Sequence, residues 1–144
     1  TASGHGAVFI LQQGRKPALL SGSDTVRAQS SANGLLAGSG DTVYAVGFRT
    51  GVLSVTDGRG TWREIARGLG SPDGIDWAHG TQGFYVSDNV GGNLYFVSRT
   101  SGGSVTRLAS GLKAPADLVI DRKRRWLVVP ENGGNRLTVY PLSS

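Results

Sequence analysis

The stretch SPDGIDWAHGTQGFYVSDNVGGNLYFV, residues Ser71–Val97, alternates short apolar runs with turn residues. Ser71–Gly74 predicts a turn, because proline presets φ for a turn and glycine tolerates a positive φ. The runs between the turns are rich in the aromatic and β-branched residues that fit a pleated sheet. Together with the segment that follows it, the stretch predicts four short strands, at Ile75–Ala78, Phe84–Val86, Leu94–Ser98 and Val105–Ala109.

The opening of this stretch recurs twice elsewhere in the chain. Ala32-Asn33-Gly34-Leu35 precedes Pro72-Asp73-Gly74-Ile75 by 40 residues, and Pro115-Ala116-Asp117-Leu118 follows it by 43 residues. Two apolar runs with a Gly-containing turn come after each opening, at 42–46 and 51–55, at 84–86 and 92–97, and at 126–129 and 134–140. Four strands joined by Gly-rich turns in about forty residues are typical of one blade of a β-propeller.

The repeat predicts an all-β chain of about three blades, each a four-stranded antiparallel sheet. We expect a partial blade at 6–31, complete blades at 32–70 and 71–113, and a partial blade at 114–142. Thr61–Arg67 is long enough for a short helix, but it aligns with the strand expected at Val105–Ala109. We therefore expect a strand there too.

The number of blades raises the question of how the ring is completed. Closed propellers have about 4–8 blades, and an open sheet edge invites pairing with another strand. We interpret the chain as half of a six-bladed ring. Two ways of completing that ring stay open, a second half-propeller segment or a second copy of this chain in a homodimer.

Composition excludes several classes of protein. The 144 residues are 38% hydrophobic and include 23 glycines, which fits one domain with many tight turns. No apolar run approaches the roughly 20 residues of a membrane span, and no signal peptide is recognisable. The absence of cysteine removes disulfides and thiolate metal sites and leaves the compartment open. There is no methionine, even at position 1, so we expect a processed or truncated product.

The net charge of +5 reflects an excess of arginine and lysine. The densest basic run, Arg122–Arg125, falls at a predicted turn between strands. A nucleic-acid site would combine such a run with stacking aromatic residues. Trp126 adjoins the run, but the strand pattern of 126–129 predicts that it belongs to the core. We therefore expect a solvated basic surface, with neither nucleic acid nor a membrane as partner.

The segments SANGL, SPDGIDWAHGTQGFYVSDNVGGNLYFV and APADLVIDRKRRWLVVPENGGNRLTVY resemble successive C-terminal blades of the senescence-marker-protein, gluconolactonase and luciferin-regenerating-enzyme family. The resemblance covers nearly the whole chain, but only about the second half of a typical member. It implies a six-bladed propeller that binds one divalent cation at its channel. The implied activity is hydrolysis of a small-molecule substrate, a lactone or related ester. Ca²⁺ is the cation expected first, with Zn²⁺ or Mn²⁺ as alternatives.

Two metal positions of that family are matched in this chain. Asn33 matches an asparagine ligand that opens one blade, and Asp73 matches the aspartate that opens the next blade, which is both ligand and proposed general base. Ala116 opens the third copy and cannot coordinate. A glutamate ligand and a further asparagine belong to blades that this chain does not contain. The resemblance thus implies a metal-dependent hydrolase that is active when the ring is completed.

Other interpretations of the same residues stay open. Asn-Gly and Asp-Gly are common turn dipeptides, and their side chains cap their own turns. The chain would then be a propeller without catalysis that binds a ligand or protein at the channel mouth, or an inactive fragment. Asp117 is expected to cap a turn or to lie at a strand end rather than to act as a ligand. Asp88-Asn89 and Glu131-Asn132 occupy equivalent places after the second strands and are expected at one rim of the channel or in structural turns.

The remaining candidates carry less chemistry. His79 lies in a predicted hairpin turn and His5 in the first residues of the chain. Ser87 lacks the surrounding pattern of a nucleophile elbow, so a Ser-His-Asp hydrolase is not expected. No phosphate-binding loop or dinucleotide fingerprint is present.

Overall fold

The structure, a computed structural model, describes residues 8–21, 31–59, 61–78, 80, 82–100 and 102–142. Within these residues the regular elements are strands, apart from a turn of 3-10 helix at Asn132–Gly134 and the 3-10 conformation of Gly80. The strands are β1 (Val8–Ile10), β2 (Ala18–Ser21), β3 (Ala32–Ala37), β4 (Val43–Gly47), β5 (Val52–Thr56), β6 (Trp62–Ala66), β7 (Pro72–Trp77), β8 (Gly83–Asp88), β9 (Asn93–Ser98), β10 (Val105–Ala109), β11 (Val119–Asp121), β12 (Trp126–Glu131) and β13 (Arg136–Pro141).

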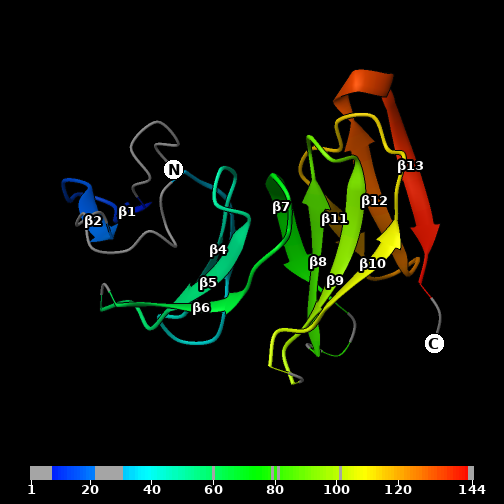
Figure 1. The fold of residues 1–144 in the computed structure, drawn as a ribbon. Coiled ribbons are helices and arrows are strands. Elements are labelled where there is room, and N and C mark those ends of the chain that lie inside the picture. The colour runs from blue at the N-terminus through cyan, green and yellow to red at the C-terminus, as the bar shows by residue number, and fades with distance from the viewer. Residues whose placement is uncertain are drawn as a thin grey trace.

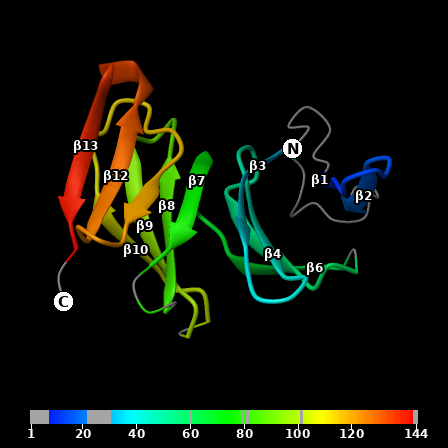
Figure 2. The same ribbon diagram turned by 180° about the vertical axis from the view of Figure 1, so that it is seen from behind.

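The strands form four antiparallel sheets in chain order: β1-β2, β3-β4-β5-β6, β7-β8-β9-β10 and β11-β12-β13. Within each sheet, every strand pairs with the next one along the chain, as short connections between antiparallel strands allow. Figures 1 and 2 show the sheets following one another from the N-terminal to the C-terminal end of the molecule. The expected all-β fold with four-stranded antiparallel sheets is confirmed, and Thr61–Arg67 contains β6 rather than a helix.

Apolar side chains fill the space between neighbouring sheets. The β1-β2 sheet packs on the β3–β6 sheet through Val8, Leu20, Ala32, Ala45 and Trp62. The β3–β6 and β7–β10 sheets share a core of Tyr44, Val46, Leu53, Ala66, Leu69, Ile75, Phe84, Val86 and Val97. The β7–β10 and β11–β13 sheets share Leu94, Leu112, Leu118, Ile120, Leu127 and Val129. Each of the two middle sheets, β3–β6 and β7–β10, therefore packs one face on the preceding sheet and the other face on the following sheet.

The hydrogen bonds repeat with the sequence. The backbone amides of three residues that follow a second strand each donate to a carbonyl oxygen just before the first strand of the same sheet. The pairs are Phe48 with Ser31, Asn89 with Ser71 and Asn132 with Ala114. These acceptors are spaced by 40 and 43 residues, the spacing of the openings. The first strands also lie side by side, since β7 contacts β3 and β11. The three openings are thereby brought to neighbouring positions.

The predicted turn at Ser71–Gly74 is wrong, because Pro72, Asp73 and Gly74 belong to β7. Pro72 pairs with Asp88 and Ile75 with Val86, so Asp73 and Gly74 lie together opposite the single residue between those partners. This arrangement is a β-bulge, which bends the strand and redirects a side chain.

The glycines of the first two openings, Gly34 and Gly74, are explained by close packing rather than by a turn. A Cβ atom on Gly34 would lie 2.4 Å from the carbonyl oxygen of Asp73, and one on Gly74 would lie 2.6 Å from the amide nitrogen of Leu118. Neither glycine has a positive φ. Each one lets its own strand approach the next opening closely.

The prediction that Trp126 belongs to the core is also wrong, because its side chain is 40% exposed. It lies on the outer face of the last sheet, where Arg124 stacks over its ring at 5.7 Å. The basic run lies at the β11–β12 turn, as expected, and Arg124 also pairs with Asp121 at 2.7 Å. His5 and His79 fall outside the described residues. Among the described residues, no helix is long and apolar enough to span a membrane.

Candidate functional site

The side chains of Asn33 and Asp73 meet between the first strands of neighbouring sheets. The Asn33 Nδ2 atom donates to Oδ1 of Asp73 at 3.1 Å, and both side chains are half-buried. Each residue occupies a β-bulge. Asn33 and Gly34 together lie opposite Val46 of β4, and Asp73 and Gly74 together lie opposite one residue of β8. The bulges therefore bring together two polar side chains from positions 40 residues apart in the sequence.

A third side chain, Asn89, joins this pair from the turn after β8. Its Nδ2 atom donates to Oδ2 of Asp73 at 3.3 Å and to the carbonyl oxygen of Pro115 at 3.1 Å. Both oxygens of the Asp73 carboxylate thus accept an amide hydrogen bond. Asn89 also ties the second opening to the third. We call Asn33, Asp73 and Asn89 the Asx cluster.

The environment of Asp73 favours its protonated form. Burial raises the pKa of the Asp73 carboxyl, and the nearby negative charge of Asp117 raises it further, while the hydrogen bond from Asn33 acts in the opposite direction. Asp117 is exposed, and its Oδ1 atom accepts the amide of the next residue, Leu118, at 2.9 Å. A carboxylate with a raised pKa is a stronger base than an ordinary one, which is the direction that a general base needs.

Ser87 stabilises the β-bulge at Asp73 and Gly74 through hydrogen bonds of its hydroxyl group. Its hydroxyl accepts the amide of Gly74 at 2.9 Å and donates to the carbonyl oxygen of Ala116 at 2.6 Å. The side chain is fully buried. The hydroxyl therefore satisfies an amide that the bulge removes from the regular ladder and fixes the second opening against the third. This role is structural, as expected for a serine outside a nucleophile elbow.

Asp88 and Glu131 hold equivalent places in the last two sheets and are both buried. The Asp88 carboxylate accepts the amides of Ser71 and Gly91 at 2.8 and 3.0 Å. The Glu131 carboxylate accepts the amide of Lys113 at 2.6 Å and a paired contact from Arg136 at 2.9 and 3.1 Å. Each carboxylate thereby connects the end of the second strand of a sheet to the segment of chain that comes just before that sheet. Of the four residues expected at a rim, Asn89 alone contacts Asp73 within the described part of the chain.

The Asx cluster offers one carboxylate and two amide groups as oxygen donors. Hard cations such as Ca²⁺ take carboxylate and amide oxygens, whereas Zn²⁺ prefers nitrogen and sulfur. Among the described residues, no three His, Cys, Asp or Glu side chains form a group that could hold a metal ion. Carboxylate and amide oxygens are of the kind that a Ca²⁺-type ion takes, and such an ion would need further oxygens from elsewhere.

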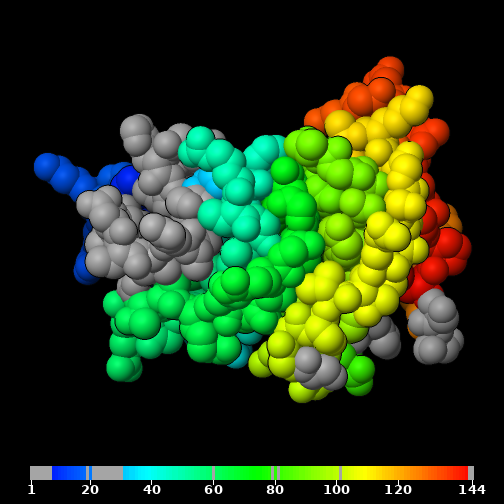
Figure 3. All heavy atoms as spheres, in the orientation of Figure 1, coloured from blue at the N-terminus to red at the C-terminus, as the bar shows by residue number. Residues whose placement is uncertain are grey.

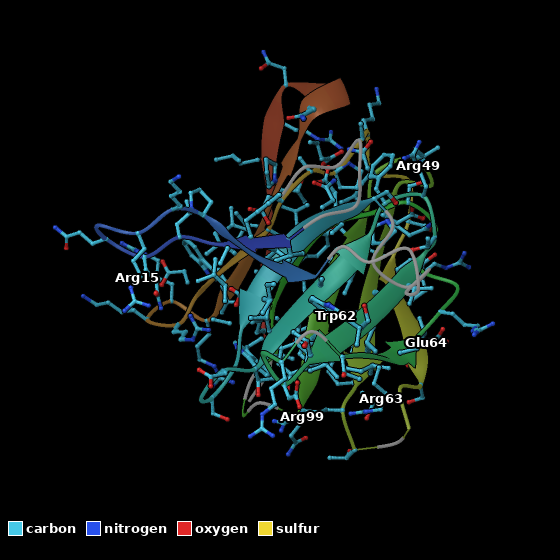
Figure 4. The ribbon with its side chains drawn as sticks, turned by 90° about the vertical axis from the view of Figure 1, so that its left-hand side faces the viewer. Arg15, Arg49, Trp62, Arg63, Glu64 and Arg99 are labelled. Atoms are coloured by element: carbon cyan, nitrogen blue, oxygen red, sulfur yellow. The ribbon has the colours of Figure 1, made fainter. Side chains whose placement is uncertain are left out.

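A hollow of about 270 Å³ lies at the other end of β7, beside Trp77. Its lining is apolar and basic, and includes Ile120, Leu142 and Arg122. A second hollow of about 320 Å³ lies between the second and third sheets, with Arg63, Glu64 and Arg99 around it (Figure 4). We place the candidate chemistry at Asp73 instead, because proton transfer needs a carboxylate with a suitable pKa and oriented partners.

The part of Asn89 in this cluster was not foreseen from the sequence. Its repeat position is the signal that could have found it. Phe48, Asn89 and Asn132 are equivalent, and only Asn89 belongs to a repeat whose opening has an aspartate in the place of Asp73. A polar side chain at position 89 can reach the Asp73 carboxylate because of the β-bulge, in which two residues of β7 lie opposite one residue of β8.

Comparison with known proteins gives similarity in fold. No protein-family model and no curated protein matches the chain. Over its whole length the chain superposes on virginiamycin B lyase from Staphylococcus aureus with a TM-score of 0.74 and 12% identity, and it covers 51% of that chain. It also matches the β-propeller domain of Cps50 (Swd1) from Myceliophteria thermophila over 81% of its length and 42% of that chain, with a TM-score of 0.61 and 13% identity.

The chain has the β-propeller fold. A further match, over 79% of this chain and 35% of the other, is a Bacteroides fragilis protein provisionally named a 6-phosphogluconolactonase, with a TM-score of 0.61 and 15% identity. The propeller chain described here spans about half the length of the lyase chains it matches. The narrower resemblance to the senescence-marker-protein family stays a prediction.

Proposed function

We propose that this chain forms part of a propeller hydrolase that opens lactones or related esters, with Asp73 as its general base. The observation that carries the proposal is the contact of Asn33 with Asp73 across two neighbouring sheets. It supports the proposal because a cation site at the axis of a propeller needs oxygen donors from more than one blade. The positions also agree with the family resemblance found in the sequence.

The residues divide the work as follows. Asn33 and Asp73 would hold a divalent cation, Ca²⁺ in the first instance, which when bound polarises the substrate carbonyl. Asp73 takes a proton from the attacking water as its oxygen bonds to the carbonyl carbon. The carbon–oxygen bond of the ring then breaks, and the proton passes to the alkoxide, which leaves as the hydroxyl of a hydroxy acid. Asn89 orients the carboxylate through its hydrogen bond to Oδ2.

The test combines Ca²⁺ titration by calorimetry with hydrolysis of glucono-δ-lactone followed in a pH-stat. Asp73→Asn should abolish Ca²⁺ binding and lower hydrolysis by about a hundredfold or more, the usual contribution of a general base. The same change removes a partly buried charge near Asp117 but also removes one accepting oxygen, so the midpoint of thermal unfolding in chelator should change little. Asn89→Ala should weaken Ca²⁺ binding by about ten- to a hundredfold, as loss of a supporting contact does.

Asn132→Ala is the matched control for Asn89→Ala, because Asn132 is the exposed equivalent in the last sheet. It should leave both readouts unchanged. If the wild-type protein binds no Ca²⁺, Mn²⁺ or Zn²⁺, the hydrolase proposal is wrong.

The second candidate is a propeller that binds a ligand or protein at the channel mouth without catalysis. One observation favours it: both oxygens of Asp73 already accept amide hydrogen bonds, from Asn33 and Asn89, so the carboxylate is satisfied without a cation. Under this function, Asp73→Asn would lose one of the two amide hydrogen bonds within the Asx cluster, because asparagine has a single accepting oxygen, and it would leave cation binding unchanged. The calorimetric titration thus separates the two functions.

A further inference from the structure

Three leucines at equivalent positions have very different exposure. Leu53, Leu94 and Leu137 each face the strand before them in the same register, paired with Val46, Ser87 and Pro130 respectively. The first two side chains are 0% and 1% exposed, whereas Leu137 is 69% exposed. Leu53 and Leu94 lie in the cores shared with the following sheet. The sheet face that carries Leu137 therefore has the same strand register as the other two faces, but no following sheet packs on it in the described part of the chain.

The neighbouring positions on that face are apolar as well. Val139 pairs with Val128, which pairs with Val119, and the equivalent pairs in the preceding sheets are Tyr44 with Val55 and Tyr85 with Phe96. Val139 and Val119 are 42% and 56% exposed. We call Val119, Trp126, Leu137 and Val139 the terminal face. It lies on the C-terminal side of the molecule, where the last strand forms the surface in the space-filling view (Figure 3).

The edge of the last sheet is also incomplete in the part of the chain that the structure describes. In the two four-stranded sheets, the third strand pairs with a fourth, as β5 does with β6 and β9 with β10. β13 holds the third place and pairs with β12 alone. A hollow of about 430 Å³ lies beside it and is lined partly by Pro130, Glu131 and Leu137. The exposed apolar face, the unpaired edge of β13 and the hollow beside it would together accommodate a further sheet.

The opposite end of the stack carries the matching surface. Val8 and Leu20 of the β1-β2 sheet pack inward on the β3–β6 sheet. Phe9 and Leu11 are 48% and 76% exposed. This end therefore presents apolar side chains away from the stack, as the side of a sheet that receives a preceding neighbour must do. Figure 4 looks onto this end, with Trp62 of the adjoining sheet labelled.

We propose that the terminal face binds the β1-β2 end of a second copy of this chain, so that two chains close one ring around a common two-fold axis. One chain carries both surfaces of the contact, and it spans about half of the lyase rings with which it superposes. A head-to-tail contact that closes after two copies forms two identical interfaces and leaves no apolar end. This inference stands independently of the proposed hydrolysis.

Sedimentation velocity over a wide range of concentration tests the inference. The wild-type protein should sediment with twice the 15.0 kDa mass of the chain. Leu137→Glu should weaken self-association by about thirtyfold or more, because an unpaired charge would be buried at the centre of the contact. Phe9→Glu should do the same from the other side. An equimolar mixture of the two variants should associate more strongly than either alone, because one of its two interfaces is intact.

Val90→Glu is the matched control, since Val90 is 74% exposed and lies in the β8–β9 turn, away from both ends. It should sediment as the wild type does. Unchanged far-ultraviolet circular dichroism shows that each variant keeps its fold. A wild-type monomer at all concentrations, oligomers larger than two, or dimers of Leu137→Glu as tight as those of the wild type would each overturn the inference.

Discussion

Glu131 shows how a buried acid can hold a sheet together. Its carboxylate accepts hydrogen bonds from Arg136, from the amide of Lys113 and from the hydroxyl of Thr138. These contacts, the Arg136 pair foremost, lower the pKa of Glu131 from 4.5 to about 2. Since the ionised form is favoured in the folded state, the contribution to stability is fully present above about pH 4.5. It is lost as the pH falls from there toward 2.

This shift predicts the pH dependence of Glu131→Gln. The variant keeps the shape of the side chain but carries no charge to titrate, so its stability should fall less steeply than that of the wild type between pH 4.5 and 2. The measurement is the urea midpoint at a series of pH values. Glu64→Gln is the control, because the Glu64–Arg67 pair is largely exposed and such pairs contribute little. Parallel curves for the wild type and Glu131→Gln would contradict the assigned role.

At the scale of the element, the openings of β3 and β7 depend on residues without a side chain. A Cβ atom on Gly74 would meet backbone atoms of Asp117 and Leu118 at 2.6–2.7 Å, and the backbone cannot move aside as a flexible side chain can. Gly74→Ala should therefore lower the free energy of unfolding by about 1–3 kcal/mol, as overpacking does.

Chemical denaturation measures this change, and Gly134→Ala is its control. A Cβ atom on Gly134 would make only ordinary contacts, the nearest at 3.5 Å to Arg136. That variant should differ from the wild type by less than about 0.5 kcal/mol. Equal losses in the two variants would show that glycine is required at Gly74 for some reason other than close packing.

The same openings show what sequence reasoning can and cannot reach. Alternating apolar residues place the strands well, and β10 coincides with the predicted Val105–Ala109. The repeat spacing also predicts that Asn33 and Asp73 face one another. A Pro-Asp-Gly sequence is compatible with a turn or a bulge, however, and the choice depends on pairing with β8 and on the approach of the next sheet. The part played by Asn89 depends on the same long-range packing.

The exposure of Trp126 is a property of the whole molecule. Its strand pattern is that of a buried strand, and the equivalent face of the preceding sheet is indeed covered. Local sequence specifies which face is apolar, but the neighbour that covers this face is another sheet, not a nearby residue of β12. A pattern typical of the core can therefore lie at the surface of a chain that spans half the length of the propellers it resembles.

The stacking of sheets predicts an order of backbone protection. The β7–β10 sheet is covered on both faces by apolar cores, whereas the last sheet is covered on one. The amides of β8, in the middle of the molecule, should exchange with deuterium most slowly, because their opening requires disruption of both cores. If the proposed dimer forms, the amides of β13 should be protected in the wild-type protein and exchange faster in Leu137→Glu. Mass spectrometry of peptides covering 83–88 and 136–141 gives both readouts, and equal protection of 136–141 in the two proteins would mean that no second copy covers this edge.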